Sequence, residues 1–292
     1  MMRTVVRLVS AGAVAGLLAV GVVAAAPGAR AAPAASAPVG VQSHWAELAN
    51  AVTGANLWSR SSVSERPMAS ITKVMTAYVV IKAGGLNRVI TVPKGIVAYD
   101  KAYGASTAGL VPGEKLTALQ LLYALLLPSG ADAAYSLAAV YGPGRTAFLA
   151  RMNGAASKLG LSKTHFSDFS GLPAPGQYTT YSTARDLIGL GRAAMRLSVL
   201  AQIVATRSYS VAAGSGHRAH TWKNLNLLLA RYSGAIGIKT GFTAAAGQCL
   251  LFEARRGTKT LIGVVLHSSS SITNPSAAVN DAIRMLNYGF SR

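Results

Sequence analysis

Residues 69–77 place a hydroxyl and an amine one helical turn apart. Ser70 and Lys73 are separated by three positions, and residues at that spacing share a helix face, with about 5–6 Å between their Cβ atoms. A serine hydroxyl is a weak nucleophile until a nearby base takes its proton. A lysine can be that base when burial or a neighbouring cation lowers its pKa. Ser70 and Lys73 are therefore a candidate pair of nucleophile and general base.

Two further clusters could complete such a site. Residues 128–132 read as a turn between two apolar segments, which can present the hydroxyl of Ser129 to a cleft. Lys239-Thr240-Gly241 is expected at the end of a strand. There the glycine permits close approach of a ligand backbone, and an exposed strand edge can pair with a peptide. Lys239 also adds a second cation, which is expected to lower the pKa of Lys73.

In this order, Ser70-x-x-Lys73, Ser129-x-x and Lys239-Thr240-Gly241 resemble the motifs of the penicillin-recognising serine peptidases and β-lactamases. The longer stretches around them resemble the low-molecular-weight D-alanyl-D-alanine carboxypeptidases, the S11 peptidase family. These stretches are 67–77, 164–166, 170–172, 181–187, 237–243 and 246–250. The resemblance extends over about residues 45–290, and chance does not produce this ordered set.

The resemblance implies roles for three side chains. Ser70 would be the acylated nucleophile, Lys73 its general base, and Ser129 the group that relays a proton to the leaving D-alanine. The substrate would be a peptidoglycan stem peptide that ends in D-Ala-D-Ala. β-Lactams would be covalent inhibitors, and the acyl group would pass either to water or to an amine.

The same resemblance implies a substrate-binding side. Lys239 and Thr240 would hold the terminal carboxylate of the substrate in a charge-assisted contact, beside Gly241. The backbone N–H groups of Ser70 and Phe242 would form the oxyanion hole, which is usually the largest electrostatic contribution to acyl transfer. No metal and no cofactor are implied.

One position departs from the family pattern. The second motif normally ends in asparagine, and here that position is Ala131. A missing hydrogen bond to a charged group is worth about 1.5–3 kcal/mol, or about one to two decades in rate. We expect a slower or narrower enzyme. The alternative is a degenerate peptidoglycan-binding or penicillin-sensing protein, although retention of Ser70, Lys73, Ser129 and Lys239 argues against it.

A β-lactamase is a second alternative. A class A enzyme shares the three motifs but uses a glutamate to activate the water that removes the acyl group. The acidic residues that follow Asp132 are Asp168, Asp186, Glu253 and Asp281, and no Glu-x-x-Leu-Asn is present. We therefore expect slow acylation by penicillin and a long-lived adduct.

Histidine-based chemistry has less support. The histidines are His44, His165, His217, His220 and His267. No G-x-S-x-G nucleophile elbow is present, which argues against a Ser-His-Asp hydrolase. No two histidines occur at the spacing of metal ligands on a helix together with a carboxylate, so no metal site is expected. The single cysteine, Cys249, lies in an apolar run and is expected to be a buried, inert thiol.

The N-terminus has the pattern of a secretory signal peptide over residues 1–31. A short basic stretch is followed by an apolar run and by the small-residue site Ala29-Arg30-Ala31. The apolar run is also about long enough to span a bilayer, so an uncleaved anchor stays open. Residues 32–42 are rich in Ala, Pro and Gly and are typical of a flexible linker. The sequence thus predicts an exported, extracytoplasmic protein.

The chain is strongly basic, with 28 Lys and Arg against nine acidic residues and a net charge of +19. Removal of the leader would take away three arginines and leave +16 (19 − 3). Such a charge favours polyanionic surroundings. An anionic cell envelope is the expected partner, and a solvated basic surface with no partner is the alternative. Nucleic acid is not expected, because no basic run is interleaved with aromatic residues.

Residues 43–292 must position these groups, and their pattern predicts one α+β domain. Strands are expected over 46–50, 55–59, 208–212, 236–240, 248–255 and 260–267. Helices are expected over 71–83, 116–127, 132–141, 146–159, 182–195 and 274–288. Strands near both chain ends imply a sheet completed by non-local pairing. The resemblance implies the β-lactamase/transpeptidase-like fold, an α/β sandwich. Its antiparallel sheet is flanked by helices, and the active site lies between the sheet and a helical lobe.

Overall fold

The computed structural model describes residues 37–172 and 179–292, together with Met1, Met2 and Leu8. The predicted signal peptide and the first part of the predicted linker otherwise lie outside the described residues. Within the remainder of that linker, Val41 is buried. The backbone amide of Gln42 donates to a carboxylate oxygen of Asp281 at 2.9 Å. The chain is therefore already held against the domain at residue 41.

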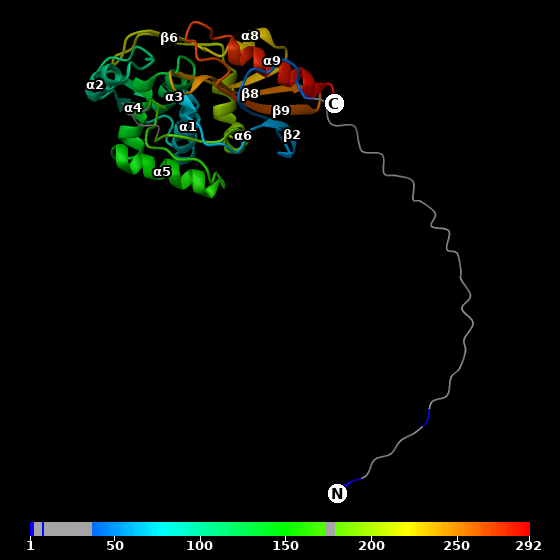
Figure 1. Ribbon diagram of the computed structural model, residues 1–292. Helices are drawn as coiled ribbons and strands as arrows, with labels where there is room; N and C mark the ends of the chain where they lie inside the picture. The colour runs from blue at the N-terminus through cyan, green and yellow to red at the C-terminus, as the bar shows by residue number, and fades with distance from the viewer. Residues whose placement is uncertain (3–7, 9–36, 173–178) are drawn as a thin grey trace. The chain divides into compact units, whose positions relative to one another are not determined.

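A five-stranded antiparallel sheet organises the domain (Figure 1). In spatial order its strands are β2 (Asn56–Arg60), β1 (Trp45–Asn50), β9 (Lys259–Leu266), β8 (Gly247–Arg256) and β7 (Ala235–Thr243). The first hairpin of the domain pairs with strands from its C-terminal third, so the predicted non-local sheet is confirmed. β7 lies at one edge, and no other described strand pairs with its outer side.

Both faces of the sheet are covered, which explains the apolar runs in β8 and β9. Leu250 and Phe252 belong to the core that packs against α9 (Ala277–Phe290). Leu251 belongs to the core on the opposite face, where it reaches α6 (Ala184–Met195). Because successive side chains of a strand point to opposite faces, a strand buried on both sides reads as a continuous apolar segment.

A helical lobe packs against the α6 face of the sheet (Figure 1). Its helices are α1 (Thr72–Ala83), α2 (Gly95–Tyr103), α3 (Ala118–Leu126), α4 (Ala131–Tyr141), α5 (Arg145–Lys158) and α7 (Ser198–Ala205). Two small two-stranded sheets and a short helix complete the described part. The sheets are β3 (Val89–Thr91) with β4 (Lys115–Thr117) and β5 (Ser208–Val211) with β6 (His220–Lys223), and the helix is α8 (Leu228–Arg231).

Local sequence signals set the ends of the helices that carry the site. α1 follows the 3₁₀ turn η1 (Ala69–Ile71) and ends at Gly84, whose φ of +75° favours glycine. α3 begins with a capping box, in which the Thr117 hydroxyl accepts from the amide of Gln120 and the Gln120 side chain accepts from the amide of Thr117. α3 ends just before Pro128, which cannot continue a helix.

Most expected elements are confirmed, with shifted boundaries. The helix expected from residue 116 begins two residues later, because Lys115–Thr117 pairs with β3 as β4. The helix expected from Ser182 begins at residue 184, and its capping side chain is Thr183. The strand expected to end at Thr240 continues as β7 to Thr243. The sequence did not predict α2, α7, α8, β3, β4 or β6.

Among the described helices, no single one is both long enough and apolar enough to cross a membrane. α6 and α7 satisfy length and hydropathy only as a pair, and that pair is bent by 104°. The apolar side chains of α6, such as Leu187 and Leu190, are fully buried in the core beside the sheet.

Candidate active site

Ser70 and Lys73 meet where η1 passes into α1. The Nζ of Lys73 lies 3.0 Å from the Oγ of Ser70. Ser70 is partly exposed, whereas Lys73 is only 1% exposed. The hydroxyl can therefore be reached by a substrate while the amine next to it is shielded from water.

Burial sets the protonation of Lys73. Loss of solvent lowers the pKa of this lysine to about 8, and the negative charges of Asp168, Asp132 and Asp100 oppose the shift. The sequence analysis expected Lys239 to lower the pKa of Lys73, and this was wrong: burial lowers it, and Lys239 is not among the groups that shift it. The repulsion between the two ammonium groups instead contributes, after burial, to a lowered pKa of Lys239.

A loop that the sequence did not assign to the site holds Lys73. The carbonyl oxygen of Ser170 accepts a hydrogen bond of 2.8 Å from the Nζ of Lys73. The Oδ1 of Asp168 fixes this loop by accepting from the amide of Ser170 at 2.6 Å and from the amide of Gly171 at 2.7 Å. The Tyr99 hydroxyl donates to the other oxygen of Asp168 at 2.8 Å. Asp168 is therefore a positioning residue for the base.

Gly171 explains how closely this loop approaches the nucleophile. Its φ of +83° lies in the left-handed region. A Cβ at this position would lie 1.9 Å from the carbonyl oxygen of Ala69 and 2.8 Å from the hydroxyl of Thr72. Only glycine lets the loop rest on η1, and the Ser-Gly pair at 170–171 is the one sequence signal for this contact.

Ser129 lies in the turn between α3 and α4, as the sequence predicts. Its φ is +66°, and the residue is only 4% exposed. Its Oγ is buried and has no hydrogen-bond partner among the described residues. A buried hydroxyl normally has a partner, so, with respect to the described residues, that of Ser129 is available to bond to a bound substrate.

Ala131 and Asp132 open α4 directly after this turn. Ala131 is fully buried, and its methyl group can form no hydrogen bond. The carboxylate of Asp132 accepts from the amides of Ala108 and Leu110, the closest contact to each being 2.9 and 3.0 Å. The carboxylate next to the altered motif position thus anchors the 108–110 segment of the chain.

Lys239 is a buried lysine on the edge strand β7. It is 2% exposed, and its Nζ donates to the carbonyl oxygen of Thr240 at 3.0 Å. None of the ion pairs among the described residues includes it. Burial and then the charge of Lys73 lower the pKa of Lys239. An anionic ligand would relieve both costs, because it would supply the missing counter-charge.

Gly241 joins β7 to the nucleophile. A Cβ there would lie 2.9 Å from the carbonyl oxygen of Met68 and 3.1 Å from the backbone nitrogen of Ser70. β7 can pack this closely against η1 because residue 241 has no side chain. Thr240 and Phe242, on either side of it, are partly exposed.

The structure thus brings Lys239-Thr240-Gly241 against the segment that carries Ser70 and Lys73. The second motif approaches this pair through Asp132, whose charge acts on Lys73, and no hydrogen bond of the Ser129 hydroxyl with the other motifs is found among the described residues.

The remaining candidate groups lie elsewhere. Cys249 is buried, as predicted, and burial raises the pKa of its thiol to about 12, which disfavours the reactive thiolate. The His220 ring bonds to Glu114 at 3.1 Å, and the His267 ring bonds to Ser270 at 2.9 Å. Among the described residues, the Ser70 hydroxyl is hydrogen-bonded to Lys73 and not to an imidazole.

Comparison with known proteins agrees with this geometry. The model of the D-alanyl-D-alanine carboxypeptidase family, peptidase S11, matches residues 31–270. The chain belongs to this family. It is accordingly a serine-type D-Ala-D-Ala carboxypeptidase with the α+β fold of the DD-peptidases, as the motifs predicted.

Individual relatives match over most of their length. The D-alanyl-D-alanine carboxypeptidase of Streptomyces sp. strain K15 is 43% identical over 82% of this chain and 84% of the relative. The D-alanyl-D-alanine carboxypeptidase DacB2 of Mycobacterium tuberculosis is 35% identical over 89% of this chain and 86% of the relative. The crystal structure of the Streptomyces K15 DD-transpeptidase is 40% identical and superimposes with a TM-score of 0.80, over 86% of this chain and 98% of that one.

Proposed function

We propose that this carboxypeptidase is exported and trims peptidoglycan stem peptides through an acyl-enzyme on Ser70. The observation that carries the proposal is the 3.0 Å contact between the Ser70 hydroxyl and the buried amine of Lys73. A neutral amine at this position can take the hydroxyl proton as the oxygen attacks. A pKa of about 8 for Lys73 keeps a useful fraction of the amine neutral near physiological pH.

The first half-reaction then proceeds in a fixed order. Ser70 Oγ forms a bond to the carbonyl carbon of the penultimate D-alanine, and Lys73 receives the proton. The amide N–H groups of Ser70 and Phe242 stabilise the oxyanion. The C–N bond breaks as Ser129 passes its proton to the leaving amine and receives in exchange the proton held by Lys73, so Lys73 returns to the neutral amine and free D-alanine departs. This leaves an ester between Ser70 and the shortened stem peptide.

The second half-reaction regenerates the enzyme. A water attacks the ester carbonyl, Lys73 takes its proton, and the Ser70 oxygen leaves and is reprotonated. Lys239 and Thr240 hold the terminal carboxylate of the intact substrate, which supplies the counter-charge that the buried Lys239 lacks. An amine that replaces the water gives transpeptidation, so the same acyl-enzyme serves either outcome.

β-Lactams are inhibitors under this proposal, because they acylate Ser70 and their adduct is removed slowly. Among the described residues, Asp168 is the acidic side chain that most strongly affects the pKa of Lys73. Its Oδ1 accepts from the amides of Ser170 and Gly171, and its Oδ2 accepts from Tyr99. A carboxylate engaged in this way is a poor base for a second water, in contrast to the glutamate of a class A β-lactamase.

The N-terminal sequence supports export, and the excess of Lys and Arg over acidic residues supports contact with an anionic envelope. Mass spectrometry of the mature N-terminus tests the first point. A start near residue 32 indicates cleavage of the leader, and an intact N-terminus in the membrane fraction indicates an anchor.

The activity itself is tested by D-alanine release from a peptide that ends in D-Ala-D-Ala. The native protein should release D-alanine, and Ser70→Ala and Lys73→Met should reduce release by at least a thousandfold. Release that is unchanged in Ser70→Ala contradicts the proposal. A native protein that binds the peptide without releasing D-alanine favours the degenerate binding protein, for which Ala131 is the supporting observation.

A further inference from the structure

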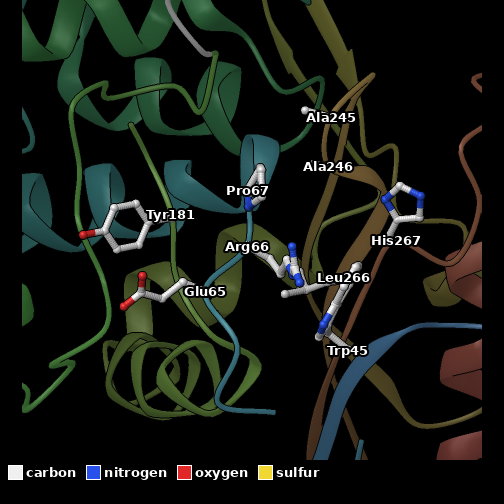
Figure 2. A pocket seen from close by; sticks show the side chains of 9 residues that line it. All are labelled: Trp45, Glu65, Arg66, Pro67, Tyr181, Ala245, Ala246, Leu266 and His267. Carbon is white, nitrogen blue, oxygen red and sulfur yellow. The ribbon is translucent and has the colours of Figure 1, made fainter. Parts of the chain in front are cut away.

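A pocket of about 510 Å³ is lined by Pro67, three positions before Ser70, and by residues that follow β7 (Figure 2). One wall is formed by Glu65 and Arg66, which lead into η1. Another is formed by Ala245 and Ala246, in the turn that follows β7, and the amide of Ala246 donates to the Thr243 hydroxyl at 3.1 Å. The pocket is therefore at the end of β7 that lies beyond the substrate-binding motif.

The order of the sites along β7 gives the direction of the substrate, if the proposed function is correct. The terminal carboxylate lies at Lys239, and the scissile carbonyl lies farther along the strand, between Ser70 and the amide of Phe242. The part of the peptide that precedes the scissile bond must then continue toward the end of β7. Its next residues reach the turn at Ala245 and the pocket beside it.

The pocket carries two opposite charges, Glu65 and Arg66, that form no ion pair with any other described residue. The guanidinium of Arg66 lies over the ring of Trp45, 4.0 Å from the ring centroid. In Figure 2 the Glu65 carboxylate lies on the side of Tyr181, and the Arg66 side chain extends toward Trp45. The anion and the cation thus occupy opposite sides of one cavity.

We propose that this pocket binds the zwitterionic amino-acid end of a side chain in the stem peptide, one that carries both an ammonium and a carboxylate group. Arg66, held by stacking on Trp45, presents its remaining N–H donors to the carboxylate. Glu65 accepts from the ammonium, and the aliphatic part of the side chain lies along the rings of Trp45 and Tyr181. A ligand with a single charge satisfies only one of the two groups.

The test uses three synthetic peptides that end in D-Ala-D-Ala and differ in the side chain of the residue before the D-alanines. The first side chain ends in an ammonium and a carboxylate, the second in an ammonium alone, and the third in a neutral acetamide. We expect kcat/KM for D-alanine release to be about three- to tenfold higher for the first peptide than for the third, with the second between them.

Two variants separate the charges. Glu65→Gln should remove the advantage of the ammonium, and Arg66→Gln should remove the advantage of the carboxylate. Both should leave the acetamide peptide within twofold of its native kcat/KM, which shows that the fold and the catalytic groups are intact. Arg151→Gln, a charge-matched change at an exposed position of α5, should leave the ranking of the three peptides unchanged.

The contrary outcomes are distinct. Equal kcat/KM for the three peptides, or variants that slow all three alike, overturns the pocket assignment and leaves the proposed function standing. A native protein that releases D-alanine from none of the peptides overturns the proposed function, and this inference falls with it.

Discussion

The buried Nζ of Lys73 donates a hydrogen bond of 2.8 Å to the carbonyl oxygen of Ser170, which lies 97 positions farther along the chain. This bond orients the amine. A neutral amine keeps two N–H donors and one lone pair, so a donor committed to the carbonyl leaves the lone pair free to face the Ser70 hydroxyl. The loop that carries Ser170 is thus part of the device that makes Lys73 a base.

The first prediction concerns pH. Below its pKa of about 8, Lys73 is protonated and has no lone pair to accept the Ser70 proton. The rate of acylation by a fluorescent penicillin should therefore rise with pH and level off above about pH 8. Rates measured from pH 6 to pH 10 check this. A rate that is flat over this range, or that falls as pH rises toward 8, contradicts a general-base role for Lys73.

The second prediction concerns Asp168→Asn. Removal of this negative charge should lower the pKa of Lys73, because Asp168 raises it in the native protein, and the acid limb of the pH profile should move to lower pH. Loss of charge on the acceptor for Ser170 and Gly171 should also reduce the free energy of unfolding, by about 1–3 kcal/mol. The pH dependence of acylation and a denaturation curve measure the two effects.

Asp186→Asn is the matched control for that change. Asp186 also accepts from a backbone amide and a hydroxyl, those of Lys163 and Thr164, but it is not among the groups that shift the pKa of Lys73. The control should lose stability and keep the native pH profile. An Asp168→Asn profile that superimposes on that of the control shows that Asp168 has no electrostatic effect on the base.

The third prediction concerns Gly241→Ala. The added Cβ would lie 2.9 Å from the Met68 carbonyl oxygen and 3.1 Å from the Ser70 nitrogen, so β7 must move away from the nucleophile. Acylation should slow by at least about tenfold, because misplacement by about an ångström is costly in catalysis. Gly154→Ala, where α5 leaves open space, should acylate at the native rate. Equal rates for the two variants exclude a tight contact at Gly241.

The fourth prediction concerns Ala131. Ala131→Asn should raise the rate of D-alanine release by about ten- to a hundredfold, because the amide adds hydrogen bonds to a site that contains charged groups. Ala131→Leu has nearly the same shape without the polar atoms and should not increase the rate. Steady-state kinetics on one D-Ala-D-Ala peptide compares the three forms. Equal effects of Asn and Leu show that the missing hydrogen bonds do not limit turnover.

Much of the fold could be predicted, because its main elements have strong local signals. The turn at Arg256-Gly257 and the apolar runs beside it predict the hairpin of β8 and β9, and the structure pairs Arg256 with Lys259 there. Boundaries were less certain. Thr117 belongs to a strand and also caps a helix, so a single apolar window over 116–127 could not separate the two elements.

The site was predicted only where side chains perform the chemistry. Ser70, Lys73, Ser129 and Lys239 lie in recognisable motifs. The support from Ser170 comes from a backbone carbonyl, and any residue type carries such a group, so the sequence marks this contact only through the neighbouring Gly171. The pocket at Glu65 and Arg66 combines segments that are distant in the chain, and only tertiary structure brings them together.

Mass spectrometry of the protein after reaction with penicillin tests the central claim most directly. The native protein should gain the mass of one penicillin, and peptide mapping should place that mass on Ser70. Ser70→Ala should gain none under the same conditions. A penicillin adduct on another residue, or equal labelling of Ser70→Ala, would contradict the assignment of Ser70 as the nucleophile activated by Lys73.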